Sequence, residues 1–349
     1  MVHVRLTSRP HALSSPDRFR ERPARARGAL QRRYHVHIVD DSEVNRVLSF
    51  PVLIEAIEAA HRRPKIAVHD GYLGDDKGQQ LVTRSAVDAG RFMMTKLYTS
   101  FPGNLAHGKL PAVQAVCVLF DGNDGRPLAV MDAAEITHWK TAADSALGAK
   151  HLARPDAETL LVVGAGEMAR WLVRGHRTVR PQLKRVRVWN RTVERAQELA
   201  ALLEEDGIAA EAVTDLDTAT RDADIITTCT RSREPLVKGA NLRPGTHLDL
   251  VGGFTPETRE SDDEAARRSR IFVDRRESAF DGVGDILQPI ASGAIKESDV
   301  LGDHYDLASG KVAGRLSDSD ITFFKNAGGG HLDLMTCETV LAQLGKELR

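Results

Sequence analysis

The sequence predicts an α/β protein with a doubly wound parallel sheet, preceded along the chain by a region of the α+β class. Two observations carry this prediction. From Thr159 onward, short apolar runs alternate with amphipathic helical stretches, which is typical of parallel strands joined by crossover helices. Between Tyr34 and Lys140, one helical stretch is followed by several strand-like runs without such alternation, and this favours a mixed arrangement.

The composition excludes several classes of function. The 349 residues can bury a sizeable core in two domains. A formal net charge of −1 gives no general attraction for nucleic acid or an anionic membrane, and no apolar run approaches the ~20 residues that span a bilayer. Cys117, Cys229 and Cys337 are too scattered for a disulfide framework or a metal site. We expect a cytoplasmic protein with a small-molecule substrate and with no nucleic-acid, membrane or metal partner.

Residues 1–33 differ from the rest of the chain. They contain nine arginines against only Asp17 and Glu21, with little hydrophobic periodicity, so we predict a disordered, Arg-rich extension. Such a segment is compatible with a transit peptide or with a basic nucleic-acid-binding arm. We favour a dispensable extension over both.

The elements of the α+β region follow from turn and periodicity signals. Thr137 is expected to cap a helix that ends before Pro155, and the alanines of this helix give it a narrow face for close packing. Asp121–Gly125 is a turn signal between two strand-like runs, so a hairpin is expected there. The expected strands are His35–Val39, Arg91–Tyr98, Ala115–Phe120 and Pro127–Met131, and the expected first helix is Val52–Arg62.

The parallel part of the chain contains a dinucleotide-binding signature. The expected strands are Thr159–Val163, Val186–Trp189, Ala223–Thr228, Thr246–Val251 and Ile271–Asp274, with helices from Glu167, over Val193–Glu204 and over Leu332–Leu344. The first of these strands runs into Gly-x-Gly-x-x-Ala, the fingerprint of a Rossmann turn. Its glycines bring backbone N–H groups to a pyrophosphate at the positive end of the next helix. Nucleotide contacts are therefore predicted at Gly164, Ala165, Gly166, Glu167 and Met168.

The end of the second parallel strand predicts which nicotinamide cofactor binds. NAD enzymes usually place Asp or Glu there on the ribose 2′-hydroxyl, whereas this chain has Asn190 and Arg191. A carboxylate would repel a 2′-phosphate, but Arg191, with Arg195 one helical turn further, can bind it through charge-assisted hydrogen bonds. We predict NADPH, with NADH less favoured.

Further cofactor contacts are expected where other strands end, because ligands of a doubly wound sheet bind at the carboxyl ends of its strands. Gly328–Gly330 permit a close approach of backbone, either to a nicotinamide ring or in a helix entry turn. The remaining predicted cofactor residues are Thr228, Cys229, Thr230, Val251, Gly252, Gly253, Phe254, Lys325 and Asn326.

Several segments occur together in a specific order between about Val39 and Leu344. They are Met94–Leu97, Val130–Asp132, Ile136–Ala146, Gly164–Gly166, Asn190–Thr192, Pro244–His247, Val251–Gly253 and Ile321–Asn326. This succession resembles the ornithine cyclodeaminase/mu-crystallin family. The resemblance implies a homodimer with a Rossmann domain, residues 141–320, and a substrate-binding and dimerisation domain built from both chain ends, residues 34–140 and 321–349.

The resemblance also implies site residues. Lys140 and Lys65 stand where the family has two substrate arginines, Lys96 matches its substrate lysine, and Thr141 matches a residue near the cofactor phosphates. Lysine keeps the positive charge but loses the planar, two-point contact that arginine makes with a carboxylate. We expect Lys65, Lys96 and Lys140 to bind substrate and Lys96 to act as the catalytic residue.

Phe254 is the most informative departure from the family pattern. Ornithine cyclodeaminases have an acid/base Asp directly after this Gly-Gly pair, and a phenylalanine cannot exchange a proton. Residues 253–262 instead resemble those of reductases of cyclic imino acids. We therefore predict NADPH-dependent reduction of Δ1-pyrroline-2-carboxylate or Δ1-piperideine-2-carboxylate to L-proline or L-pipecolate.

Three points stay open at this stage. The charged iminium needs a counter-charge, for which Asp144 and Asp285 are the candidates. One alternative activity is that of an ornithine cyclodeaminase or an alanine-dehydrogenase-like enzyme. The other alternative is a non-catalytic protein that binds NADPH and a small ligand, as mu-crystallin does.

Overall fold

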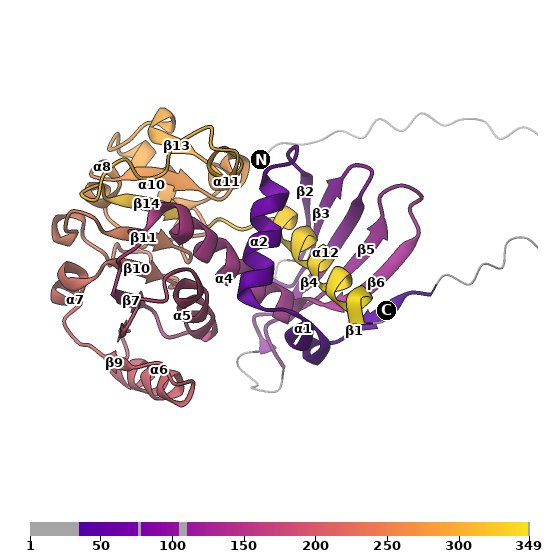
Figure 1. Ribbon diagram of the computed structural model, residues 1–349, viewed down its shortest axis with the longest axis horizontal. Coiled ribbons are helices and arrows are strands. Elements are labelled where there is room, and N and C mark those ends of the chain that lie inside the picture. Colours follow the sequence, from indigo (N-terminus) through magenta and orange to yellow (C-terminus); the bar gives the residue numbers. More distant parts are fainter. Residues whose placement is uncertain (1–34, 76–77, 105–109, 348–349) are drawn as a thin grey trace, which may run out of the picture. The chain divides into compact units, whose positions relative to one another are not determined.

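The structure, a computed structural model, describes residues 35–75, 78–104 and 110–347. Residues 1–33, with their predicted lack of order, lie outside the described residues. From Val36 onward the chain forms one unit. Two β-sheets belong to it, and Figure 1 shows their strands with the helices that cover them.

The first sheet is built from the N-terminal part of the chain. Its strands are β1 (His37–Val39), β2 (Ala67–Gly74), β3 (Gln80–Asp88), β4 (Phe92–Ser100), β5 (Val113–Asp121) and β6 (Pro127–Asp132). They lie in the order β1-β6-β5-β4-β3-β2. The β1–β6 pair is parallel and the others are antiparallel, so the predicted β5–β6 hairpin is confirmed.

The second sheet has eight strands, all parallel. They are β7 (Thr159–Val163), β8 (Arg185–Trp189), β9 (Ala210–Ala212), β10 (Ile225–Thr228), β11 (His247–Leu250), β12 (Arg270–Val273), β13 (Val300–Gly302) and β14 (Thr322–Lys325). The order is β13-β12-β14-β11-β10-β7-β8-β9. Because β8 and β10 flank β7 on opposite sides, the sheet is doubly wound, as predicted, and its ligand crevice is expected at the carboxyl ends of β7 and β10.

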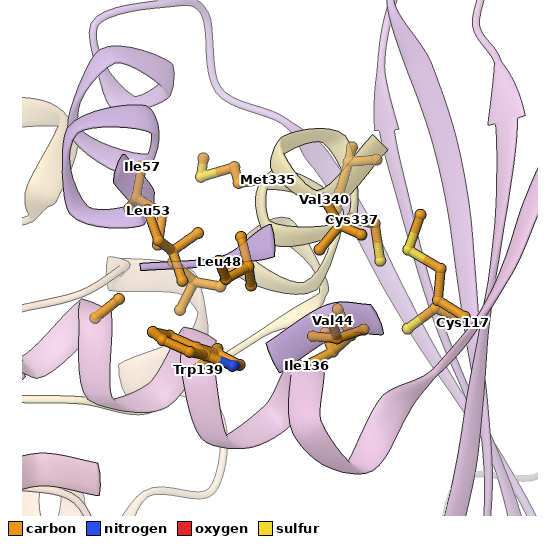
Figure 2. Packing of buried hydrophobic residues seen from close by; sticks show 14 of the residues in the cluster. Val44, Leu48, Leu53, Ile57, Cys117, Ile136, Trp139, Met335, Cys337 and Val340 are labelled. Atoms are coloured by element: carbon orange, nitrogen blue, oxygen red, sulfur yellow. The ribbon is translucent and has the colours of Figure 1, made fainter. Parts of the chain in front are cut away.

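Helices cover these sheets and join them. They are α1 (Asp41–Val47), α2 (Phe50–His61), α4 (Ala133–Leu152), α5 (Glu167–Val179), α6 (Val193–Glu205), α7 (Leu216–Asp222), α8 (Asp263–Arg267), α9 (Arg276–Ala279), α10 (Gly284–Ala291), α11 (His304–Ala308) and α12 (Gly330–Glu347). The C-terminal helix α12 packs on the first sheet and beside α2 and α4. Figure 2 shows Met335, Cys337 and Val340 of α12 among apolar side chains of α1, α2 and α4.

The two faces of the first sheet differ in their surroundings. One face lies under α12, and it carries the buried side chains of Val82, Ala86 and Met94. Val82 and Ala86 share this face because alternate side chains of a strand point to the same side of the sheet. The opposite face carries exposed apolar side chains from five of its six strands. They are Ile38, Leu73, Leu81, Val87, Met93 and Val116.

One predicted helix start is wrong, and two elements of the structure lie across the predicted domain boundaries. The helix expected to begin at Thr137 begins one turn earlier, because the Asp132 side chain accepts a hydrogen bond from Ala134 N at 2.8 Å and caps it. The domain boundary at residues 140/141 therefore falls inside a continuous helix, α4. The second predicted domain boundary, at residue 321, lies next to β14, which is buried throughout and pairs with β11 and β12 of the parallel sheet. Of the described residues after 321, those of α12 pack on the first sheet.

Candidate active site

The glycine turn after β7 has the geometry of a pyrophosphate site. Gly164 has a φ of +115°, in the left-handed region that favours glycine, and a Cβ there would lie 3.0 Å from the Cys229 carbonyl oxygen. Gly166 is the N-cap of α5 and provides no side chain to cap it. Its Cβ position faces open space. The first N–H groups of a helix have no partners within the helix, so an N-terminus without a capping side chain and with open space beside its first residue fits a bound phosphate group.

The end of β8 provides the cationic side chains predicted for a 2′-phosphate. Asn190 is half-buried and its amide donates to the Thr192 carbonyl at 2.9 Å. Arg191 and Arg195 are both exposed, and neither makes an ion pair with another residue in the described ranges. Their guanidinium groups are therefore available to a nucleotide that lies along the edge of the sheet.

A buried carboxylate, Glu260, organises the next two strand ends. It accepts hydrogen bonds from Thr228 Oγ1 at 2.6 Å, from Thr230 N and Oγ1 at 2.5 and 2.8 Å, and from Gly252 N at 2.7 Å. The Thr228 side chain therefore faces the protein interior, and the prediction that it contacts the cofactor is wrong for this side chain. Burial raises the pKa of Glu260, and the nearby Asp285 carboxylate adds to that effect. No motif or residue spacing in the sequence indicated this role for Glu260.

Lys325 is also turned inward, contrary to the predicted cofactor contact. Its side chain is fully buried, and its Nζ lies 3.0 Å from Asp285 Oδ2. The Asp285 carboxylate also accepts from Glu260 N at 2.7 Å, and a Cβ on Gly253 would lie 2.1 Å from it. The Asp285 carboxylate thus binds buried partners in the region of the parallel sheet. Phe254, in contrast, is 52% exposed.

Helix α4 is fixed to the parallel sheet at the turn that carries Lys140 and Thr141. The Asn326 amide donates to the Thr141 carbonyl and to Ser145 Oγ, both at 3.0 Å, and Ser145 Oγ donates to the buried Asp249 at 2.9 Å. Asn326 therefore positions the helix. Three residues predicted at the cofactor, Met168, Cys229 and Val251, pack against the apolar cluster that contains the following alanines of α4. Burial raises the pKa of the Cys229 thiol.

Lys96 and Lys140 lie on either side of one carboxylate, Asp333 of α12. Lys96 Nζ is 3.3 Å from Asp333 Oδ1, and Lys140 Nζ is 3.3 Å from Asp333 Oδ2. Lys96 also donates to Thr137 Oγ1 at 2.5 Å, and Lys140 to the Gly329 carbonyl at 3.4 Å. The close backbone approach of the triple glycine is thus to Lys140, in the entry turn of α12. No pattern in the sequence indicated Asp333, which comes from the other end of the chain.

Electrostatics in this cluster favour an additional anion. Burial by itself raises the pKa of Asp333, but the charges of Lys140, Lys96 and Arg84 outweigh it, so this pKa lies below its ordinary value. Burial, aided by the charges of Lys96 and Arg84, lowers the pKa of Lys140 against the opposing influence of Asp333. One carboxylate therefore compensates its cationic neighbours only in part.

Arg84 is a member of this cluster that sequence reasoning missed. It stands opposite Lys96 in the β3–β4 ladder and opposite Asp70 in the β2–β3 ladder, and its Nε donates to Asp70 Oδ2 at 2.9 Å. The sequence contained one signal for this residue. Arg84 lies two positions from each of the buried residues Val82 and Ala86, in a strand next to the one that carries Lys96.

Lys65 and Asp144 do not join the cluster. Lys65 Nζ lies 2.8 Å from Asp303 Oδ2 and 3.2 Å from Glu277 Oε1, so the structure pairs it with two carboxylates of the parallel-sheet region, and its substrate role stays a prediction. Asp144 Oδ1 lies 2.9 Å from His304 Nε2, and burial raises the pKa of Asp144 well above its ordinary value. Burial thus disfavours the charged form of Asp144, and the carboxylate that lies next to Lys96 and Lys140 is Asp333.

Neither a metal-binding cluster nor a membrane-spanning helix is present in the described ranges. These residues contain no group of three or more His, Cys, Asp or Glu side chains arranged to hold a metal ion. None of the helices in the same ranges is long and apolar enough to cross a membrane.

Comparison with known sequences identifies the family. The sequence profile of the ornithine cyclodeaminase/mu-crystallin family matches residues 47–344. The chain belongs to this family. A Δ1-pyrroline-2-carboxylate reductase of Paracoccus denitrificans is 46% identical to it over 290 residues, which are 82% of this chain and 90% of the relative.

Solved structures of the family have the same fold. The Δ1-pyrroline-2-carboxylate reductase of Thermococcus litoralis, in complex with NADH and L-proline, has a TM-score of 0.82 at 28% identity, over 89% of this chain and 98% of that one. An archaeal alanine dehydrogenase dimer with bound NAD also has a TM-score of 0.82 at 28% identity, over 90% of this chain and 97% of that one. The predicted family, its reductase branch, the fold class and a nicotinamide-dependent oxidoreductase are confirmed.

Replacing Asp333 tests the buried cluster. Asp333→Asn should lower the free energy of unfolding at pH 7 by about 3–5 kcal/mol, because it leaves two buried ammonium groups without their carboxylate. The folded-state pKa of Asp333 lies below its ordinary value of 3.8. The carboxylate therefore stabilises the protein fully above that ordinary value, and its contribution is lost as the pH falls through the folded-state pKa.

Urea unfolding at neutral and acid pH measures this effect. The difference between parent and variant should be largest at neutral pH and should narrow in acid. Asp156→Asn is the matched control, since Asp156 also pairs with a cationic side chain, that of Arg154, but is exposed. Equal stability of the parent and Asp333→Asn at pH 7 would contradict the assignment.

Proposed function

We propose that this protein reduces a cyclic imino acid, Δ1-pyrroline-2-carboxylate or Δ1-piperideine-2-carboxylate, to L-proline or L-pipecolate with NADPH. The observation that carries the proposal is the charge balance of the cluster on β3, β4, α4 and α12. Arg84, Lys96 and Lys140 are three cations, whereas Asp70 and Asp333 are two carboxylates. One positive charge is left in excess, which favours a monoanionic carboxylate as ligand.

The position of this cluster supports a substrate next to the cofactor. Lys140 directly precedes Thr141, whose carbonyl is bonded to Asn326 at the edge of the parallel sheet. A carboxylate bound by Lys140 would therefore lie beside the crevice at the ends of β7 and β10. The reductases of Paracoccus denitrificans and Thermococcus litoralis are named for an imino acid of this kind, which favours the same substrate class here.

The residues of the chain account for the chemistry as follows. When bound, the nicotinamide supplies a hydride to the C=N carbon. Lys96, fixed by Thr137 and Asp333, is the group we assign to hydrogen-bond the substrate and to maintain its protonated ring nitrogen. Asp333 offsets the positive charge of both lysines, so that an iminium is less strongly repelled. The protonated ring nitrogen makes the carbon electrophilic, and no base in the position of Phe254 is required.

Two alternatives differ in an observable product. An alanine-dehydrogenase-like enzyme has support from the similarity to an archaeal alanine dehydrogenase, and in the oxidative direction it would release ammonia. An ornithine cyclodeaminase would also release ammonia, but the exposed Phe254 replaces its acid/base residue. A non-catalytic binding protein would bind the cofactor without oxidising it.

The activity has a direct test. The purified protein should oxidise NADPH in the presence of Δ1-pyrroline-2-carboxylate and form L-proline, and it should release no ammonia above background from L-ornithine and NAD, because Phe254 cannot act as an acid or base. Cofactor absorbance, proline and ammonia are the measurements. Proline formed efficiently from ornithine would overturn the proposal, and tight NADPH binding without turnover on any imino acid would favour a binding protein.

NADPH preference is proposed from Arg191 and is tested separately. The charge-assisted contact with a 2′-phosphate should favour NADPH over NADH by at least ~1 kcal/mol, about fivefold in kcat/KM. Arg191→Asp should abolish or reverse the preference. Arg267→Asp is the control, because Arg267 is likewise exposed but pairs with Glu264 on α8. Equal kcat/KM values for the two cofactors in the parent protein would remove Arg191 from the 2′-phosphate site.

We also propose a cytoplasmic location, which is consistent with the three free cysteines.

We further propose that the protein forms a homodimer through the face of the first sheet opposite α12. Exposed apolar side chains on this face are typical of an interface, and the similar alanine dehydrogenase is described as a dimer. Val116→Lys should convert a dimer to a monomer in sedimentation equilibrium. Leu202→Lys on α6 should not, although Leu202 is 42% exposed and Val116 41%. A monomeric parent would contradict this assembly.

A further inference from the structure

Three side chains form a charged row across neighbouring strands of the first sheet. Asp70 of β2 stands opposite Arg84 of β3, which stands opposite Lys96 of β4. Directly opposed residues of an antiparallel pair have their side chains on the same face, with Cβ atoms about 5 Å apart. Lys96 contacts Asp333 of α12, so the row points toward the candidate substrate position.

We propose that Arg84 binds the substrate carboxylate and determines specificity for cyclic imines that carry one. This proposal rests on the proposed function and deepens it by naming a residue that supplies a planar, two-point contact. Lys96 and Lys140 cannot make such a contact, because an ammonium group is a point charge. Arg84, on β3, therefore provides the planar, two-point contact with a carboxylate that the lysine at position 140 cannot make.

The hydrogen bonding of Arg84 leaves the required edge of its guanidinium group available. Asp70 Oδ2 accepts from Nε at 2.9 Å, which fixes the plane of the group. Within the described ranges, no acceptor is bonded to Nη1 or Nη2. The side chain is 27% exposed, so it is not fully covered by the protein and has room to meet a ligand. Two parallel N–H groups then match the two oxygens of a carboxylate.

Asp333 cannot serve as the missing partner of Arg84. Its Oδ1 is directed to Lys96 and its Oδ2 to Lys140, each at 3.3 Å. Two cations directly opposite each other in a sheet are unfavourable without an anion to share, and Arg84 and Lys96 are such a pair. A second carboxylate at this point would relieve that repulsion. The substrate provides one.

A purely structural role for Arg84 makes a different prediction. An Asp70–Arg84 cross-strand pair alone would contribute to stability in a half-exposed sheet, as such pairs commonly do, and its loss would affect all substrates alike. A carboxylate-binding role affects only substrates that carry the carboxylate. Comparing Δ1-pyrroline-2-carboxylate with Δ1-pyrroline, the same ring without the carboxylate, separates the two roles.

The experiment compares four variants of the full chain, each with a single substitution. Arg84→Met should lower kcat/KM for Δ1-pyrroline-2-carboxylate by about tenfold to a hundredfold, mainly through KM, with little change for Δ1-pyrroline and with cofactor affinity unchanged. Arg84→Lys should recover only part of this loss, since it restores the charge without the planar contact. Asp70→Asn should raise KM with kcat retained, because Asp70 is a positioning residue. Arg126→Met is the matched control, since Arg126 pairs with Asp121 on the β5–β6 turn.

Binding of pyrrole-2-carboxylate, a planar analogue that cannot be reduced in this reaction, provides a second measurement that does not depend on turnover. Calorimetry should show its affinity reduced at least tenfold in Arg84→Met and unchanged in Arg126→Met. An unchanged affinity and KM in Arg84→Met, or an equal loss for both pyrrolines, would overturn the proposal. If the parent protein binds the analogue but reduces no imino acid, the proposed function fails while the role of Arg84 in carboxylate binding stands.

Discussion

The carboxylate of Asp333, between Lys96 and Lys140, is the interaction on which the arrangement of this protein depends. It joins α12 from the C-terminal end to β4 and α4 from the N-terminal half. Two buried ammonium groups without a carboxylate would be strongly unfavourable, so α12 must pack where it does for the lysines to remain charged. The same constraint leaves the cluster short of one negative charge, which links the stability of the fold to the binding of an anion.

Other buried carboxylates fix the parallel sheet in a similar way. Glu260 binds the ends of β10 and β11, and Asp285 pairs with Lys325 at the end of β14. Asp249 accepts hydrogen bonds from Ser145, Thr227 and His176 and so fixes α4 and α5 to the sheet. Each carboxylate satisfies donors that would otherwise be buried without partners. These hydrogen bonds fix the strand ends relative to one another, which suits the proposed site, where a cofactor and a substrate must meet at a fixed distance.

The two sheets contribute different parts of the proposed site. The parallel sheet provides the glycine turn, an open helix N-terminus at α5 and the exposed Arg191. The first sheet provides Arg84 and Lys96, and α4 carries Lys140 across the junction between them. Family members that share this architecture act on different small amino or imino acids. Residues on β3 and at the Phe254 position, rather than the fold, are where such differences in substrate can arise.

Local patterns in the sequence determined the parallel strands and the glycine turn with the helix that follows it, because strand periodicity and turn chemistry depend on neighbouring residues; the candidate lysines at 96 and 140 came from the family resemblance. The family resemblance added the role of both chain ends. Tertiary structure alone decided the partners of the charges: Lys65 pairs with Asp303 and Lys325 with Asp285. It also brought Asp333 to Lys96, 237 positions away. Burial of a charge requires a partner in space, and a sequence states only which charges are present.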